Sequence, residues 1–165
     1  MPALSRVAAG FALSVALLMI PSSAHAATCA GADSRGGTSA TRTAALRCLV
    51  TQTRAASGLA PLRRARALST GARRQATAIT RCGTFSHNPC GRTAPSRCTV
   101  TGENLAWAPP GATPREILAL WLASPGHRAN ILSAQFGQTG FARRTASLNG
   151  LGRGELWVQE FGVGC

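Results

Sequence analysis

Three side chains capable of acid–base chemistry or metal binding stand out because the chain has few of their kind. The sequence contains three histidines and five acidic residues among 165. His87 and His127 both lie in segments rich in glycine, proline or serine, and Glu103 lies between Gly102 and Asn104. Two neutral imidazoles suit a divalent metal such as zinc, and a carboxylate can ligate the metal or hold a water molecule. We therefore predict that folding brings His87, Glu103 and His127 into one pocket.

Two other interpretations of these residues are open. Ser86 or Ser124 with a histidine and Glu103 would make a serine hydrolase triad, but the chain has no Gly-x-Ser-x-Gly motif and Ser124 is more simply a helix N-cap. In the second interpretation, the polar cluster has no ligand and only ties the domain together. Whether the protein is an enzyme is not decided by the sequence.

The N-terminal segment has the pattern of a secretory signal peptide. A charged start with Arg6 precedes an apolar stretch that is too short to span a bilayer, and Ala24-His25-Ala26 is a small-x-small cleavage motif. We therefore expect residues 1–26 to be removed and residues 27–43, rich in glycine, serine and threonine, to form a flexible arm. No second apolar run follows, so we expect no transmembrane segment after cleavage and a secreted, extracellular or cell-wall-associated protein.

All six cysteines follow the predicted cleavage point. In an exported chain an even number of cysteines indicates disulfides, and their spacing matches no zinc-finger or zinc-ribbon pattern. Cys29 and Cys48 are the expected pair, because that bridge is short and would tie the arm to the first helix. Cys82, Cys90, Cys98 and Cys165 allow three pairings, which stay open.

The chain carries a formal net charge of +13, and all of its basic residues other than histidine are arginine. The arginines are scattered, and many precede the segment that contains the mature aromatic residues, so the basic and stacking side chains of a nucleic-acid binder do not coincide. We expect no specific nucleic-acid partner. Attraction to anionic cell-wall polymers or lipid headgroups is favoured by the charge alone.

The pattern of apolar residues predicts helices first, and strands both among and after them. Helices are expected at about 44–57 and 65–81, the second with Leu68, Ala72, Gln75, Ala76 and Ile79 facing inward. Thr113, Pro114 and Glu116 have the pattern of a capping box that starts a third helix. A short fourth helix is expected to end near Leu132. Strands are expected at 100–106, 136–142 and 155–163, the last two joined by a long hairpin loop. This order indicates a single α+β domain.

Several motifs occur in an order that resembles the CAP superfamily, which groups the cysteine-rich secretory, antigen 5 and pathogenesis-related 1 proteins. The chain is most similar to the short bacterial branch, and Arg54 with the Gly58–Leu62 segment matches the exit of that branch's first helix. The matching segments are Phe85-Ser86-His87, Gly102-Glu103-Asn104-Leu105-Ala106, Trp121 to Leu132 with Ser124-Pro125-Gly126-His127-Arg128 inside it, Gly140, and Trp157 to Gly162.

The resemblance implies an α–β–α sandwich around a small central antiparallel sheet, over residues 44–165. We expect the domain to be a monomer stabilised by its disulfides. It also implies a cleft formed by His87, Glu103, Asn104, His127 and Arg128. There His87 and His127, with Glu103, would hold zinc or another divalent metal, or the cleft would bind a cell-envelope lipid or glycan. A metal-dependent extracellular hydrolase and a purely structural domain are the alternatives.

The chain departs from the family pattern at two positions near this cleft. Eukaryotic relatives have a second acid just after the helix tryptophan, where this chain has Leu122-Ala123-Ser124. Gln75 stands where bacterial relatives often have a histidine. Glu116 lies earlier in the same helix, and its expected role is the capping box. The sequence therefore predicts a site with one acid.

Overall fold

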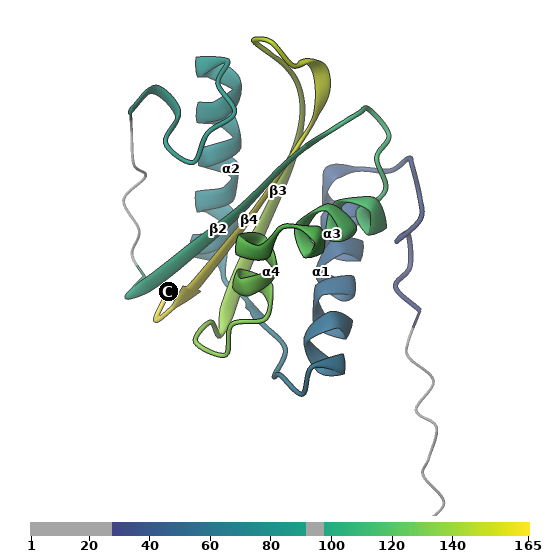
Figure 1. Cartoon of the computed structure of the whole chain (residues 1–165), viewed down its shortest axis with the longest axis vertical. Coiled ribbons are helices and arrows are strands. Elements are labelled where there is room, and N and C mark those ends of the chain that lie inside the picture. The colour runs from purple at the N-terminus through teal and green to yellow at the C-terminus, as the bar shows by residue number, and fades with distance from the viewer. Residues whose placement is uncertain (1–27, 92–97) are drawn as a thin grey trace, which may run out of the picture.

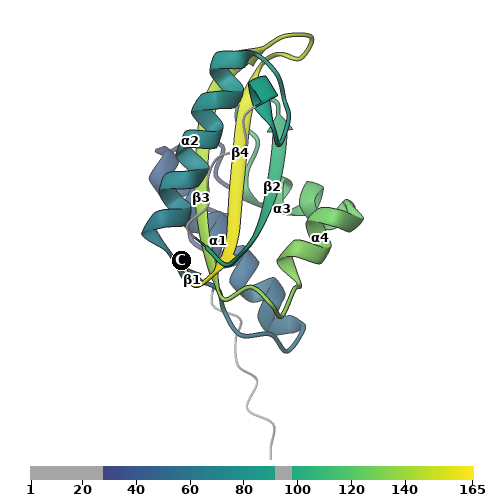
Figure 2. The ribbon, with the colours of Figure 1, turned by 90° about the vertical axis from the view of Figure 1, so that its left-hand side faces the viewer.

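The computed structural model of the protein describes residues 28–91 and 98–165, so the predicted signal peptide lies outside the described residues. A four-stranded sheet lies between two helical layers, with α2 against one face and α1, α3 and α4 against the other (Figures 1 and 2). This is the α–β–α sandwich expected from the family resemblance. In chain order the elements are α1 (Ser39–Ala56), β1 (Arg63–Arg64), α2 (Arg66–Cys82), the 3-10 turn η1 (Pro89–Gly91), β2 (Val100–Ala108), α3 (Pro114–Ala123), α4 (Pro125–Ile131), β3 (Gln138–Leu148) and β4 (Gly152–Val163).

The first helix begins earlier than its apolar pattern predicts. It starts at Ser39 rather than near Ala44, because the Thr38 side chain caps the main-chain N–H of Thr41. The segment before it is held by the Cys29–Cys48 disulfide, as predicted, and by an ion pair of Asp33 with Arg115 in α3.

The second helix has the inward face that the sequence predicts. Its buried residues include all five expected positions, Leu68, Ala72, Gln75, Ala76 and Ile79. It ends at Gly83, which has a left-handed backbone conformation. At its first turn it lies against Gly140 of β3 so closely that a Cβ there would overlap the main chain of Leu68 and Ser69. The glycine thus sets the distance between α2 and the sheet.

The sheet has the strand order β1-β3-β4-β2. The long strands β3, β4 and β2 are antiparallel, while the short β1, which the sequence did not predict, adds parallel to β3 and makes the sheet mixed. The predicted hairpin was wrong in its proportions. The strands extend to Leu148 and from Gly152, so residues 149–151 alone form the turn, with Gly150 at positive φ.

Alternate residues along the strands belong to two separate hydrophobic core clusters, one on each face of the sheet. Trp157 and Phe161 of β4 face α1, α3 and α4, whereas Leu156 and Val158 face α2. Trp121 of α3 and Trp157 are both fully buried, which confirms that they belong to the core. Since side chains alternate along a strand, Glu103 and Leu105 of β2 share the α2 face, and Asn104 points to the other face.

A buried charge cluster closes the end of the core near the β2–α3 connection. Glu155 is paired with Arg42 of α1 and Arg143 of β3, and it accepts a hydrogen bond from the main-chain N–H of Gly111. Both guanidinium groups also lie over the ring of Trp157. Burial would raise the pKa of Glu155, but the hydrogen bonds from Arg143, Gly111 and Arg42 outweigh it and hold that pKa at about 2.

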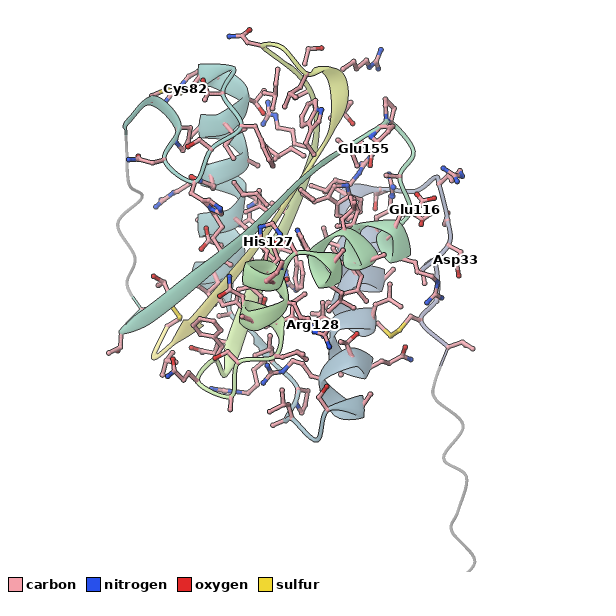
Figure 3. All side chains as sticks on the ribbon, viewed as in Figure 1. Asp33, Cys82, Glu116, His127, Arg128 and Glu155 are labelled. Carbon is pink, nitrogen blue, oxygen red and sulfur yellow. A yellow bond between two sulfur atoms is a disulfide. The ribbon has the colours of Figure 1, made fainter. Side chains whose placement is uncertain are left out.

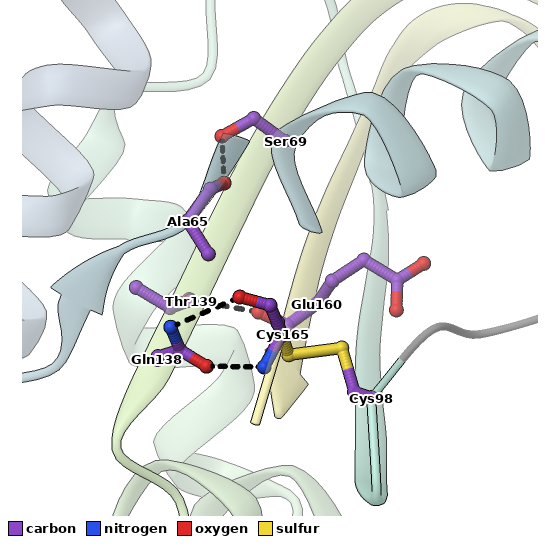
Figure 4. Close-up of a disulfide and its surroundings, with 7 residues drawn as sticks. All are labelled: Ala65, Ser69, Cys98, Gln138, Thr139, Glu160 and Cys165. Carbon is purple, nitrogen blue, oxygen red and sulfur yellow. Dashed lines mark hydrogen bonds between the residues drawn. A yellow bond between two sulfur atoms is a disulfide. The ribbon is translucent and has the colours of Figure 1, made fainter. Parts of the chain in front are cut away.

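The remaining disulfides resolve the pairing that the sequence left open. Cys82 pairs with Cys90 and ties the loop after α2 to the end of that helix. Cys98 pairs with Cys165 and joins the segment before β2 to the C-terminus after β4. Gln138 bonds both main-chain groups of Cys165, so the chain end is also fastened to β3 (Figure 4).

Candidate functional site

The centre of the candidate site is a pair of carboxyl groups on neighbouring strands. Glu103 of β2 and Glu160 of β4 are direct partners in the antiparallel register, and both lie on the α2 face. Directly opposed side chains on one face of a sheet lie within contact distance. The two carboxyl groups are hydrogen-bonded to each other. Two carboxyl groups in such contact cannot easily both be ionised, so the pair retains a proton.

His87 reaches this carboxyl pair from the loop after α2. Its Nδ1 is hydrogen-bonded to Oε1 of Glu103 at 2.6 Å. Gln75 of α2 positions both groups, because its Nε2 donates to the main-chain oxygen of His87 at 2.8 Å and to Oε1 of Glu103 at 3.3 Å. The side chain of His87 is 62% exposed and that of Glu103 only 16%. The imidazole is therefore the accessible group and the carboxyl the sheltered one.

His127 comes to the site from the opposite helical layer. It lies in α4, which packs on β2, the outermost strand on this side of the sheet (Figure 3). The side-chain amide of Asn104 donates to the main-chain oxygen of His127 at 3.1 Å. Asn130 of α4 donates to the main-chain oxygen of Glu103 and to Oδ1 of Asn104. These bonds fix α4 against β2 and place His127 beside the strand that carries Glu103.

Burial and neighbouring charges shift the pKa values of three residues of the site so that their uncharged forms are favoured. Burial raises the pKa of Glu103 to about 7, although the hydrogen bonds from Glu160 and Gln75 act against it. Burial, together with the charge and hydrogen bond of Glu103, raises the pKa of Glu160 to about 8. Burial and the nearby charge of His87 lower the pKa of His127. Near neutral pH the cluster thus carries less charge than its residue types alone suggest.

The structure brings the predicted residues together to different degrees. His87 and Glu103 are in direct contact, and the charge of His87 contributes, after burial, to the lowered pKa of His127. Asn104 is fully buried and serves the α4–β2 contact. Arg128 is exposed on α4, and its side chain makes no ion pair with the described residues. Ser124 is the N-cap residue of α4 but makes no side-chain capping bond.

Sequence reasoning missed Glu160 as a member of the site. The segment Trp157 to Gly162 matches a family motif, but nothing local in it indicates a role for its acid. The signal was the side-chain alternation of two strands: once β2 and β4 are paired, Glu103 and Glu160 fall opposite each other. The second acid of this chain therefore comes from β4, and Glu116 takes part in the capping box as predicted.

The donor types present suit a divalent cation, but their arrangement does not form a ready metal site. Carboxylates and imidazoles are zinc ligands. Across residues 28–91 and 98–165, however, no group of three or more His, Cys, Asp or Glu side chains is placed to hold a metal ion. The carboxyl groups of Glu103 and Glu160 are instead joined through a hydrogen bond.

The fold and the cluster define a small disulfide-bonded α–β–α domain with a carboxyl–imidazole site at one edge of its sheet. A model of the cysteine-rich secretory protein (CAP) family matches residues 42–161. The chain belongs to this family, whose proteins are extracellular. No curated protein sequence matches it. Within the described residues, no helix has the length and apolar character needed to cross a membrane.

Solved structures share the fold at low sequence identity. An outer surface protein of Borrelia burgdorferi is similar with a TM-score of 0.64 and 19% identity, covering 77% of this chain and 96% of that one. An extracellular SCP-domain protein of Bacillus anthracis has a TM-score of 0.56 and 20% identity, and the match covers 78% of this chain and 44% of that one. A cysteine-rich secretory protein of Staphylococcus aureus has a TM-score of 0.54 and 15% identity, and the match covers 75% of this chain and 39% of that one. The chain thus spans less than half of the latter two proteins.

Proposed function

We propose that the protein is a secreted binding module that takes a hydroxyl-rich cell-envelope ligand, such as a glycan or a lipid headgroup, at the His87–Glu103–Glu160 cluster. The observation that carries this proposal is the hydrogen bond between the exposed imidazole of His87 and the sheltered carboxyl of Glu103. A protonated carboxyl pair both donates and accepts hydrogen bonds, and an imidazole does the same. Hydroxyl groups need both kinds of partner.

The position of the cluster also supports a binding role. His87 lies on a loop that the Cys82–Cys90 disulfide and Gln75 hold in place, so the site loses little conformational freedom when a ligand binds. The formal charge of +13 would attract the chain to anionic cell-wall polymers and raise its local concentration there.

Binding to purified cell-envelope fractions of the native host tests the proposal. The change His87→Ala should lower retention by about ten-fold, which corresponds to about 1.4 kcal/mol. Asn88→Ala is the matched control, because Asn88 lies next to His87 and is also exposed. Thermal melting of both variants should stay close to the wild type. If His87→Ala binds as the wild type does, or binding is lost only together with folding, the cluster is structural and the proposal is wrong.

A second proposal for the same cluster is a divalent metal such as zinc, with a metal-dependent hydrolase as its functional consequence. It is supported by the residue types alone, two imidazoles and two carboxyl groups, because among the described residues no three of these side chains are placed to hold an ion and metal binding would require them to rearrange. Calorimetric titration with zinc checks it. Saturable binding at micromolar zinc that His87→Ala and Glu160→Gln each abolish would support it, and absence of binding at that concentration would exclude this version.

A further inference from the structure

A cavity of about 390 Å³ lies at the edge of the sheet opposite the carboxyl–imidazole cluster. It is formed where α1 and α2 flank the outer side of β3, with the end of β1 closing it. Its polar lining consists of four arginines and three hydroxyl residues from four different elements: Arg47, Arg64, Arg73, Arg143, Ser39, Thr43 and Ser69. We call it the arginine cavity.

The arginine cavity has no internal counter-charge beyond one shared carboxylate. The sequence has five acidic side chains. Asp33 and Glu116 pair with exposed arginines elsewhere, and Glu155 is shared between Arg42 and Arg143. Glu103 and Glu160 belong to the carboxyl pair. All five acidic side chains lie in the ranges that the structure describes, and there Arg47, Arg64 and Arg73 form no ion pair with any of them, although Arg73 donates a hydrogen bond to the Thr70 hydroxyl.

The hydroxyl groups and the sheet edge add directed hydrogen-bonding groups. Ser39 donates to the main-chain oxygen of Arg143 and Ser69 to that of Ala65, so both hydroxyl oxygens can accept from hydroxyl groups of a ligand, while the guanidinium groups are the donors to its phosphate. The β1 strand pairs only with Gln138 and Thr139. Beyond that point the outer edge of β3 has no strand partner among the described residues. Phe141, two residues after Thr139, directs its main-chain N–H to this edge.

We propose that the arginine cavity binds a small phosphate-bearing molecule of the phosphomonoester class. Guanidinium groups bind phosphate oxygens through paired, charge-assisted hydrogen bonds, and the three guanidinium groups without an acidic partner equal in number the three terminal oxygens of a phosphomonoester. The volume is that of a pocket for a small organic ligand. The phosphate is carried either by a free metabolite-sized molecule or by a lipid headgroup, which present the same chemistry to the cavity.

Calorimetry with glycerol 3-phosphate at fixed ionic strength tests this binding on the full exported chain. The variant Arg47→Ala/Arg64→Ala/Arg73→Ala should weaken binding by at least about ten-fold. The control Arg74→Ala/Arg81→Ala/Arg153→Ala removes the same charge from exposed positions outside the cavity and should change it by less than about two-fold. Replacing the three cavity arginines with lysine keeps the charge and should still weaken binding, because lysine lacks the planar fork.

A parallel arm with vesicles of phosphatidic acid distinguishes the source of the phosphate. Saturable binding of glycerol 3-phosphate that depends on the cavity arginines supports a free ligand, and cavity-dependent binding of vesicles alone supports a headgroup. Equal losses for the two triple alanine variants would show attraction by net charge and overturn the proposal. Absence of saturable binding in both arms would overturn it as well. None of these outcomes depends on His87, so the proposal stands or falls separately from the proposed function.

Discussion

Glu103 and Glu160 face each other across the β2–β4 ladder and share a hydrogen bond between their carboxyl groups. The two residues are far apart in the sequence, and the antiparallel register alone makes them neighbours. Their contact turns two ordinary acids into a pair that keeps a proton near neutral pH. It also gives the candidate site two carboxyl groups where the sequence indicated one.

The carboxyl pair should make the folded state less stable as pH rises. Because the pKa of Glu160 is raised from 4.5 to about 8, the folded state binds more protons than the unfolded state in that interval, and the free energy of unfolding falls with pH. The variant Glu160→Gln retains the size but not the ionisation. We expect it to be more stable than the wild type at pH 9 by roughly 1–3 kcal/mol.

Urea denaturation between pH 6.5 and 9 measures this effect. The lower limit avoids the opposing contribution of His127, whose lowered pKa makes the folded state more stable as pH rises toward 6.5. The slope of unfolding free energy against pH should be shallower in Glu160→Gln than in the wild type. Parallel slopes for the two proteins would contradict a shared proton in this pair.

Glu155 should make the folded state less stable as pH falls, the reverse of the effect of Glu160. Its pKa is held at about 2, so it stabilises the fold above pH 4.5 and this contribution is lost as pH falls from about 4.5 to about 2. The variant Glu155→Gln leaves Arg42 and Arg143 without a counter-charge next to Trp157. We expect a loss of about 3–5 kcal/mol at pH 7, measured by chemical denaturation. Asp33→Asn, which breaks an exposed ion pair, is the control and should have little effect.

Gly140 should tolerate no side chain. A methyl group there would overlap the main chain of α2 at Leu68 and Ser69, so Gly140→Ala must push the helix away from the sheet. We expect a loss of about 1–3 kcal/mol in the free energy of unfolding. Gly137→Ala is the matched control, because a Cβ at that nearby glycine meets nothing within 4 Å. Similar stabilities of the two variants would show that the close approach of α2 and β3 is not required.

The disulfide between Cys98 and Cys165 should contribute more to stability than the one between Cys82 and Cys90. The first spans 67 residues and the second 8. Loop-closure entropy then predicts losses of about 4 and about 2.5 kcal/mol when each pair is changed to alanine. Thermal and urea unfolding of the two double variants gives the comparison. A larger loss for the short bridge would mean that native contacts, and not the unfolded chain, govern its contribution.

The sequence by itself determined the features that depend on residues close in the chain. The inward face of α2 follows from helical spacing, the start of α3 from the capping box of Thr113 and Glu116, and the Cys29–Cys48 bridge from its short separation. These are local interactions, whose geometry is set by the period of the helix or by a short loop. The family motifs added the overall sandwich and the approach of His87 to Glu103.

Only the tertiary structure decided what depends on strand register and on the packing of distant elements. Strand β1 is too short to carry a pattern of its own, and its pairing is set by the position of β3. The pairing of Cys98 with Cys165 and the contact of Glu103 with Glu160 both follow from the register of β2 against β4. A shift of that register by one residue would separate both pairs. The arginine cavity likewise exists only because α1, α2 and β3 meet there, since its arginines are scattered in the sequence and share no local pattern.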